Sequence, residues 1–262
     1  MGGRFSNLEF GDERPDESLA PLGQSAHERD AGQILDRAHT AHCDGQYEAA
    51  LRLYTRALKE DRRLIRAWVG QVQMLVNLGE YREARVWSDK ALELFRNNGD
   101  LLAAKAQACI RLKDKASALA CSDGAMQSAG SSPWRWEVRG EVLLGRSERH
   151  YDSCFQKALE EPTADWFDRV LIARIYRFHR RAASAIRYAQ EAIEMVPTQA
   201  YNWFELGACQ QDLGLIGAAQ TSYQRCLELR PDCREASDAL SSLDSVPFST
   251  WLRSVIQRWR GR

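Results

Sequence analysis

The sequence lacks a net charge, a long apolar run and a secretory leader. Its 36 basic and 36 acidic side chains cancel, so no overall field draws the chain to nucleic acid or to an anionic surface. No stretch approaches the roughly 18 uninterrupted apolar residues that a membrane-spanning helix needs. No apolar run follows a basic segment near the first residue, as a secretory signal requires. These absences predict a cytoplasmic protein that does not bind nucleic acid.

Clustered cysteines and catalytic motifs are also missing. The seven cysteines are scattered and include no CxxC pair, which indicates reduced thiols in an intracellular protein rather than a disulfide framework. Phosphate-binding, nucleophile-elbow and zinc-protease motifs are absent. His39, His42 and Cys43 have metal-like chemistry, but no fourth ligand recurs at a suitable spacing, so a polar groove lining is the better interpretation. We therefore expect no enzymatic activity, no metal and no cofactor.

A repeat of small residues dominates what is present. One series recurs at steps of 34, 34, 33, 34 and 34 positions, and a second series lies seven positions earlier with the same steps. Small side chains at two fixed places let helices approach closely, and stacking buries the apolar face that one hairpin cannot bury alone. The period predicts six stacked helical hairpins, with Cys226 as inert packing. The first series is Ala57, Ala91, Ala125, Ala158, Ala192 and Cys226, and the second is Ala50, Ala84, Ala118, Tyr151, Ala185 and Ala219.

The residues within each repeat form a more specific pattern. Repeat six contains Trp203, Leu206, Gly207, Gly214, Ala219, Tyr223, Cys226 and Pro231; repeat one contains Gly45, Tyr47, Ala50, Tyr54 and Ala57; repeat four contains Trp136, Gly140, Phe155 and Ala158. At these positions the sequence resembles the tetratricopeptide repeat family. Repeats three and five match least, because Ser122 and Ala189 stand where the family has an aromatic residue. In repeat four, the turn near Gly145 to Ser147 is one residue short.

This resemblance implies an all-α fold, a right-handed superhelical α-solenoid of six hairpins. The capping helix that such an array needs is predicted over residues 234–244, where apolar residues from Ala236 to Leu243 share one face. The predicted repeats are 31–64, 65–98, 99–131, 132–165, 166–199 and 200–233.

Two segments lie outside the predicted array. Residues 1–30 are polar and acidic and are predicted to be a mostly disordered arm. It is either a plain leader or a docking peptide that uses Phe5, Leu8 and Phe10, with this chain's own groove as one docking site. Residues 245–262 are predicted to form a basic amphipathic helix that packs on the end of the array, on a partner or on a membrane surface. Gly2 lies in a pattern that fits N-myristoylation. The face of the predicted helix comprises Trp251, Leu252, Val255, Ile256, Arg258 and Trp259.

The family register also predicts a binding groove, because the first helix of each tetratricopeptide hairpin lines the concave surface. Repeats four to six place aromatic residues and arginines there, and these side chains dominate the binding energy of protein interfaces. The competing interpretation is that some of these rings pack between hairpins. The predicted groove residues are Trp134, Phe167, Arg174, Arg177, Phe178, Tyr201, Phe204 and Gln211.

We therefore predict a non-enzymatic scaffold that holds a peptide or helix of another protein in this groove. Two alternatives remain open: a peripheral membrane organiser that uses the C-terminal helix, with or without acylation, and a regulatory subunit of an enzyme complex. A pentatricopeptide array, which reads RNA, has a similar period, but the Trp, Gly, Tyr and Ala pattern and the neutral charge argue against it.

Overall fold

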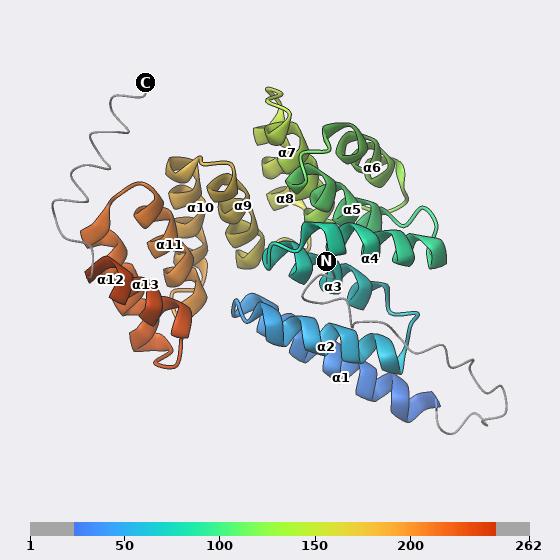
Figure 1. The fold of residues 1–262 in the computed structure, drawn as a ribbon, viewed down its shortest axis with the longest axis horizontal. Helices are drawn as coiled ribbons and strands as arrows, with labels where there is room; N and C mark the ends of the chain where they lie inside the picture. Colours follow the sequence, from blue (N-terminus) through green and yellow to red (C-terminus); the bar gives the residue numbers. More distant parts are fainter. Residues whose placement is uncertain (1–23, 245–262) are drawn as a thin grey trace. The chain divides into compact units, whose positions relative to one another are not determined.

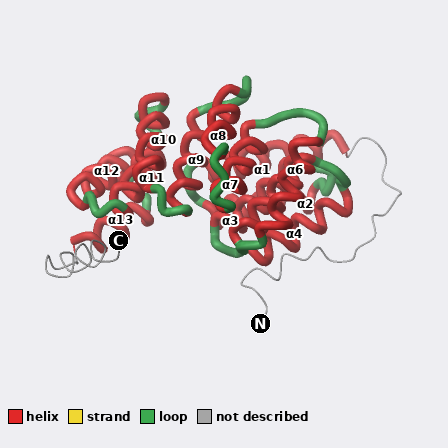
Figure 2. The backbone as a smooth tube through the Cα atoms, turned by 90° about the horizontal axis from the view of Figure 1, so that it is seen from above, coloured by secondary structure: helices red, strands yellow, loops and turns green. Residues whose placement is uncertain are grey.

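The computed structural model describes residues 24–244, and all regular secondary structure within them is α-helical. No strand occurs among these residues, as the colours of Figure 2 show. The predicted all-α repeat fold is therefore confirmed. The helices are α1 (Gln24–Cys43), α2 (Tyr47–Glu60), α3 (Ile65–Asn77), α4 (Tyr81–Leu94), α5 (Gly99–Arg111), α6 (Lys115–Gln127), α7 (Pro133–Gly145), α8 (Tyr151–Glu160), α9 (Trp166–Phe178), α10 (Ala182–Met195), α11 (Ala200–Asp212), α12 (Ile216–Leu229) and α13 (Arg234–Asp244).

Two compact units divide the chain, one up to Thr163 and one from Ala164. Within the described range the N-terminal unit holds α1 to α8 and the C-terminal unit holds α9 to α13. No helix in residues 24–244 combines the length and the apolar character needed to cross a bilayer. The predicted lipidation residue Gly2, the Phe5–Phe10 cluster and the predicted helix in residues 245–262 lie outside the described residues.

Consecutive helices pair as hairpins, and the hairpins stack within each unit. In the N-terminal unit α1 pairs with α2, α3 with α4, α5 with α6 and α7 with α8, and the first helices α3, α5 and α7 contact one another in order (Figure 1). In the C-terminal unit α9 pairs with α10 and α11 with α12, α11 also contacts α9, and α13 packs on α12. Each hairpin thus covers the apolar face of its neighbour.

The first helix begins earlier than the polar sequence predicts. The predicted arm extends to residue 30, but α1 already begins at Gln24. Adding residues to a helix that packing has already nucleated is far easier than nucleating a new one. A packed segment from Ala31 onward, where buried side chains begin, therefore extends its helix into the preceding polar residues.

Each first helix ends in the same hydrogen-bonded turn. In the second hairpin Glu80 N–H bonds to Leu75 O at 2.9 Å, the six-to-one bond of a Schellman motif, and equivalent bonds end the other five first helices. The motif needs one residue in the left-handed conformation, which glycine adopts without strain. Gly45, Gly79 and Gly214 take this place in three hairpins, whereas Lys113 (φ 65°), Ser147 (φ 64°) and Arg180 (φ 58°) take it in the other three.

The irregularity of the fourth hairpin lies beyond its turn, which corrects the sequence prediction. Ser147 follows Lys113 by the normal 34 positions, so the turn is not short. The link from α7 to α8 is instead longer, residues 146–150, and α8 is a short helix of 10 residues. Tyr151 is therefore the first residue of α8 and only half-buried, unlike the alanines of its series. The missing position of this repeat falls between the turn and Ala158.

Glycines on the first helices let large rings lie directly against the backbone. A Cβ atom at Gly140 would sit 2.4 Å from the ring of Phe155, and one at Gly207 would sit 2.7 Å from the ring of Tyr223. Both rings are almost fully buried. These contacts fix the spacing of the two helices in the fourth and sixth hairpins, because no side chain fits between the ring and the helix.

The tryptophans of the repeat pattern form hydrogen bonds with the links between hairpins. Trp68 Nε1 donates to Arg62 O at 2.9 Å, and Trp203 Nε1 donates to Pro197 O at 2.9 Å, six residues earlier in both cases. Trp136 Nε1 instead donates to the Glu161 carboxylate at 3.0 Å. The indole ring buries apolar area, while its N–H donates to an oxygen acceptor of a link that lies outside the helices.

Candidate partner-binding surface

The strongest site in the C-terminal unit is built on the contacting first helices α9 and α11. The start of α9 is fixed by a capping box, in which Asp165 accepts from Phe167 N–H at 2.7 Å and Asp168 accepts from Asp165 N–H at 2.7 Å. Residues 174 and 178 are four positions apart and therefore share one face of α9, as do Phe204 and Gln211 on α11. We call the residues Arg174, Arg177, Phe178, Phe204 and Gln211 the α9–α11 surface.

A buried carboxylate organises the arginines of this surface. The Glu205 side chain on α11 is only 2% exposed and accepts from Arg177 Nη1 at 2.7 Å, while Arg174 Nε lies 3.5 Å from its other oxygen. The Tyr201 hydroxyl also donates to Glu205, and Arg177 Nε reaches Asp212 at 3.3 Å. Such a carboxylate is stable inside the protein only because several donors compensate its charge. The cluster therefore holds both guanidinium groups in place.

The ionisation of this cluster follows from the same contacts. The neighbouring Glu205 carboxylate raises the pKa of Arg177, so that its charge is fixed at every physiological pH. Burial raises the pKa of Tyr201 well above its ordinary value, which keeps the hydroxyl protonated as a donor. Burial also raises the pKa of Cys209, so this thiol is not a nucleophile at neutral pH. The arrangement can bind and orient a ligand, but it presents no activated group.

The aromatic residues next to this cluster divide into buried and accessible rings. Phe204 is half-buried and stacks on Tyr201, with ring centroids 5.6 Å apart and an angle of 27° between the planes. Phe178 is 41% exposed, whereas Phe167 and Tyr201 are only 6% and 3% exposed. The first two can contact a partner directly. Phe167 and Tyr201 correspond to the packing interpretation, and sequence periodicity could not separate the two classes.

The remaining predicted groove residues have different environments. Gln211 is half-buried, and its amide oxygen accepts from the Tyr223 hydroxyl at 2.7 Å. Trp134 belongs to the N-terminal unit, where its half-buried ring packs against a core cluster that includes Ala103 and Val138. The prediction therefore combined seven residues of one unit with one residue of the other.

The N-terminal unit contains a similar buried carboxylate. Glu141 on α7 is fully buried, accepts from Gln107 Nε2 at 2.8 Å and forms an ion pair with Arg111, both on α5. Glu141 and Glu205 are the residues whose role the sequence does not reveal. The one available signal in the sequence is an acidic residue within an otherwise apolar helix face. This signal does not indicate which arginine of the preceding hairpin pairs with the carboxylate.

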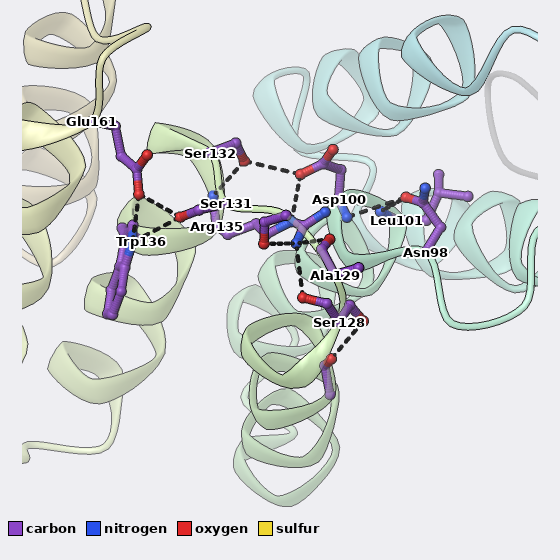
Figure 3. Close-up of polar contacts among 12 residues, drawn as sticks. Asn98, Asp100, Leu101, Ser128, Ala129, Ser131, Ser132, Arg135, Trp136 and Glu161 are labelled. Atoms are coloured by element: carbon purple, nitrogen blue, oxygen red, sulfur yellow. Dashed lines mark hydrogen bonds and ion pairs between the residues drawn. The ribbon is translucent and has the colours of Figure 1, made fainter.

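A second polar network in the N-terminal unit is structural. The Arg135 guanidinium occupies the space that a side chain at residue 99 would need. A Cβ atom at Gly99 would lie 2.3 Å from Arg135 Cζ. The guanidinium donates to Asp100 at 2.8 Å and to the carbonyls of Ala129 and Gly130 at 3.0 and 2.7 Å (Figure 3). Because Arg135 is only 7% exposed, it ties the link after α6 to the start of α5 and offers little to a partner.

The histidine cluster of the first hairpin does not form a metal centre. His42 is buried and lies 3.3 Å from the Asn77 amide, and Cys43 Sγ lies 3.7 Å from His39 Nε2. Across residues 24–244 no three His, Cys, Asp or Glu side chains are grouped so that they could hold a metal ion.

Comparison with known proteins places the last hairpin in a known family. Residues 200–233, which form α11, α12 and the link that follows, match the model of the tetratricopeptide repeat. This match and the stacked helical hairpins support a tetratricopeptide repeat protein. This fold supports a role in protein–protein interaction as a scaffold, and the stacked hairpins of both units are its repeats.

Related proteins match this chain over only part of their own length. Superkiller complex protein 3 of Mus musculus is 28% identical over 158 residues, which are 59% of this chain and 10% of that protein. The Protein SGT1 homolog of Oryza sativa subsp. japonica is 31% identical over 84 residues, 32% of this chain and 23% of that protein. The chain thus spans about a tenth of the length of Superkiller complex protein 3.

A solved structure shares the fold of the tetratricopeptide array. A tetratricopeptide repeat protein from Parabacteroides merdae superposes with a TM-score of 0.51 at 16% identity, covering 87% of each chain. At this identity the likeness concerns the arrangement of helices alone.

Proposed function

We propose that the chain is a non-enzymatic interaction scaffold whose α9–α11 surface binds a peptide or helix of a partner protein. The observation that supports this proposal is the Glu205 cluster, which holds Arg174 and Arg177 next to the half-buried ring of Phe204. Interface residues with restricted side chains lose less conformational entropy on binding. Arginines and aromatic rings are also the residue types that form energetic hot spots.

The charges of the surface define the chemistry of the partner. Two arginines face Glu205 and Asp212, so the cluster is close to neutral and does not require a highly charged ligand. The planar guanidinium of Arg177, whose side chain is 33% exposed, suits a carboxylate or carbonyl acceptor. Phe178 and Phe204 suit an apolar anchor. We therefore expect a short segment with an aromatic or aliphatic anchor flanked by an acceptor group.

The experiment is a selection of peptides from a display library on the full-length chain, followed by fluorescence anisotropy with selected peptides. The double variant Phe178→Ala/Phe204→Ala should raise the Kd by a factor of roughly 30 or more, because a hot-spot loss is at least about 2 kcal/mol. Met195→Ala is the matched control, since Met195 is an exposed apolar residue on the second helix α10 and does not belong to the α9–α11 surface.

The outcome separates specific binding from general adhesion. Unchanged affinity of the double variant, with its helical circular dichroism intact, would remove the α9–α11 surface as the binding site. An equal loss in Met195→Ala would show that the selected peptides bind exposed apolar side chains anywhere on the array.

A further inference from the structure

The last hairpin and the capping helix contain two cysteines that lie close to each other. Cys226 lies in the last turn of α12, and Cys233 lies immediately before α13. Both are buried in the same core cluster, at 0% and 3% exposure. The two thiols are near enough for each to shift the pKa of the other. Two buried thiols of one cluster, seven positions apart and on both sides of a short link, are placed to form a disulfide after a small movement.

The surroundings of the two sulfur atoms are unequal. Arg230 Nη2 lies 3.0 Å from Cys233 Sγ. Cys233 also directly precedes the first turn of α13, whose Ala236 N–H contributes to a lower pKa of this thiol, because helix N-termini stabilise negative charge. The Cys233 thiol donates to the Glu235 carboxylate at 3.6 Å, a contact that favours the protonated thiol and opposes that charge.

These contacts give the pair one thiolate and one thiol near neutral pH. The nearby Cys226 thiol, followed by Arg230 and the Ala236 N–H, lowers the pKa of Cys233 to about 6. The nearby Cys233 sulfur and burial raise the pKa of Cys226. A thiolate is the attacking species in disulfide exchange, so Cys233 is the nucleophile of the pair and Cys226 is its resolving thiol.

The cysteines of the N-terminal unit provide a contrast. Cys109 and Cys121 line one polar pocket together with Arg85, Asp89 and Lys105. Burial raises the pKa of Cys109 to about 11 and raises that of Cys121. Both therefore stay protonated at neutral pH, and proximity alone does not make a cysteine pair reactive.

We propose that Cys226 and Cys233 form a thiol–disulfide exchange site that takes a small disulfide, such as glutathione disulfide, as its oxidant. The Cys233 thiolate attacks one sulfur of glutathione disulfide, which gives a mixed disulfide and releases one glutathione thiolate. Cys226 then loses its proton to solvent and attacks Cys233 Sγ, which releases the second glutathione. Two protein thiols are oxidised to one intramolecular disulfide while one glutathione disulfide is reduced to two glutathiones.

Access to the buried pair depends on α13. This helix packs on α12, and it is the last helix of the described residues. A helix covered on one side by a single neighbour opens at low free energy compared with the core of an array. Opening of α13 would expose Cys233, which precedes its first turn. The disulfide would then link α12 covalently to the start of α13 and hold the capping helix in place.

The test is a titration of the full-length protein with glutathione redox buffers, followed by alkylation of free thiols, tryptic digestion and mass spectrometry. Arg230 precedes a proline, so trypsin leaves residues 226–234 as one peptide containing both cysteines. We expect the disulfide form of this peptide, which lacks two hydrogen atoms and carries no alkyl group. It should appear at a lower fraction of glutathione disulfide than a disulfide between any other pair of cysteines. A first disulfide between Cys109 and Cys121, or none at all, would overturn the proposal.

Single substitutions test the assigned roles. Cys226→Ser should trap the glutathione adduct on Cys233, because no resolving thiol remains, whereas Cys233→Ser should leave Cys226 unmodified. Arg230→Gln should slow adduct formation at pH 7 by several-fold in the Cys226→Ser background. Equal adduct yields on the two single variants, or a rate that Arg230→Gln leaves unchanged, would contradict the assignment of Cys233 as the nucleophile. Circular dichroism of each variant verifies that the helices remain folded.

Discussion

Two glycines of the last hairpin allow a test in which the same substitution has opposite effects. Gly207 lies in α11, and its missing Cβ atom would sit 2.7, 2.8 and 3.2 Å from three ring carbons of Tyr223. Gly217 lies near the start of α12, and nothing lies within 4 Å of its Cβ position. Replacing either glycine by alanine favours the helix by about 0.5 to 1 kcal/mol, so only the local space differs.

The magnitude at Gly207 follows from how far the ring must move. Carbon atoms in contact prefer separations of about 3.5 to 4.0 Å, so the Tyr223 ring or α11 must shift by roughly 1 Å. Tyr223 is 1% exposed and its hydroxyl is held by Gln211 at 2.7 Å, so the ring has nowhere to turn. Overpacking of this kind costs about 1 to 3 kcal/mol. After the helix gain, Gly207→Ala should destabilise the protein by roughly 0 to 2.5 kcal/mol, with a central value of about 1 kcal/mol.

The assay is urea unfolding of the full-length variants followed by circular dichroism at the helix band. Gly207→Ala should unfold at a lower urea concentration than the unsubstituted protein, and Gly217→Ala at an equal or higher one. If Gly207→Ala is as stable as Gly217→Ala, the close approach of Tyr223 to α11 is wrong, and so is the view that glycine sets the helix spacing in this hairpin.

Three further predictions concern the charges, a cap and the C-terminal segment. Glu205→Gln should destabilise the protein by about 2 to 4 kcal/mol, because it leaves the donors of two partly buried arginines without their carboxylate. By contrast, Arg225→Ala, which breaks an exposed pair with Glu228, should change stability by less than about 1 kcal/mol in the same urea assay. Asp165→Ala should cost about 1 kcal/mol by removing the cap of α9, and an unchanged urea midpoint would contradict the capping box. Finally, if residues 245–262 form a membrane-binding helix, the full-length chain should float with anionic liposomes and a chain ending at Asp244 should not. Flotation of neither protein, or of both, would exclude this role for the segment.

The sequence predicts the hairpins well because their signal is local and repeated. Helices α3 and α11 begin at Ile65 and Ala200, the first residues of the predicted second and sixth repeats. The turn glycines and the small residues each report a contact that recurs every 34 positions. A packing rule applied six times gives a strong pattern even where single repeats, such as the third and fifth, match poorly.

The candidate site was predictable only in part because it depends on pairs of residues that differ between repeats. The register placed Arg174 and Arg177 on a first helix, but only the structure shows that Glu205 of the next repeat holds them. The register likewise placed both Phe204 and Tyr201 in the predicted groove, although the Phe204 ring stacks on the Tyr201 ring. Burial depends on both flanking helices, and a single-repeat pattern contains no information about them.

The left-handed turn residues have a consequence for how stability is distributed along the chain. Glycine turns end the first helix in the first, second and sixth hairpins, whereas Lys113, Ser147 and Arg180 adopt the same backbone conformation in the third, fourth and fifth. A residue with a Cβ atom loses about 1 kcal/mol in this conformation relative to glycine. The third, fourth and fifth hairpins therefore carry more backbone strain at this turn than the first, second and sixth. Their amide protons should exchange with solvent sooner than the position of these hairpins in the chain would indicate.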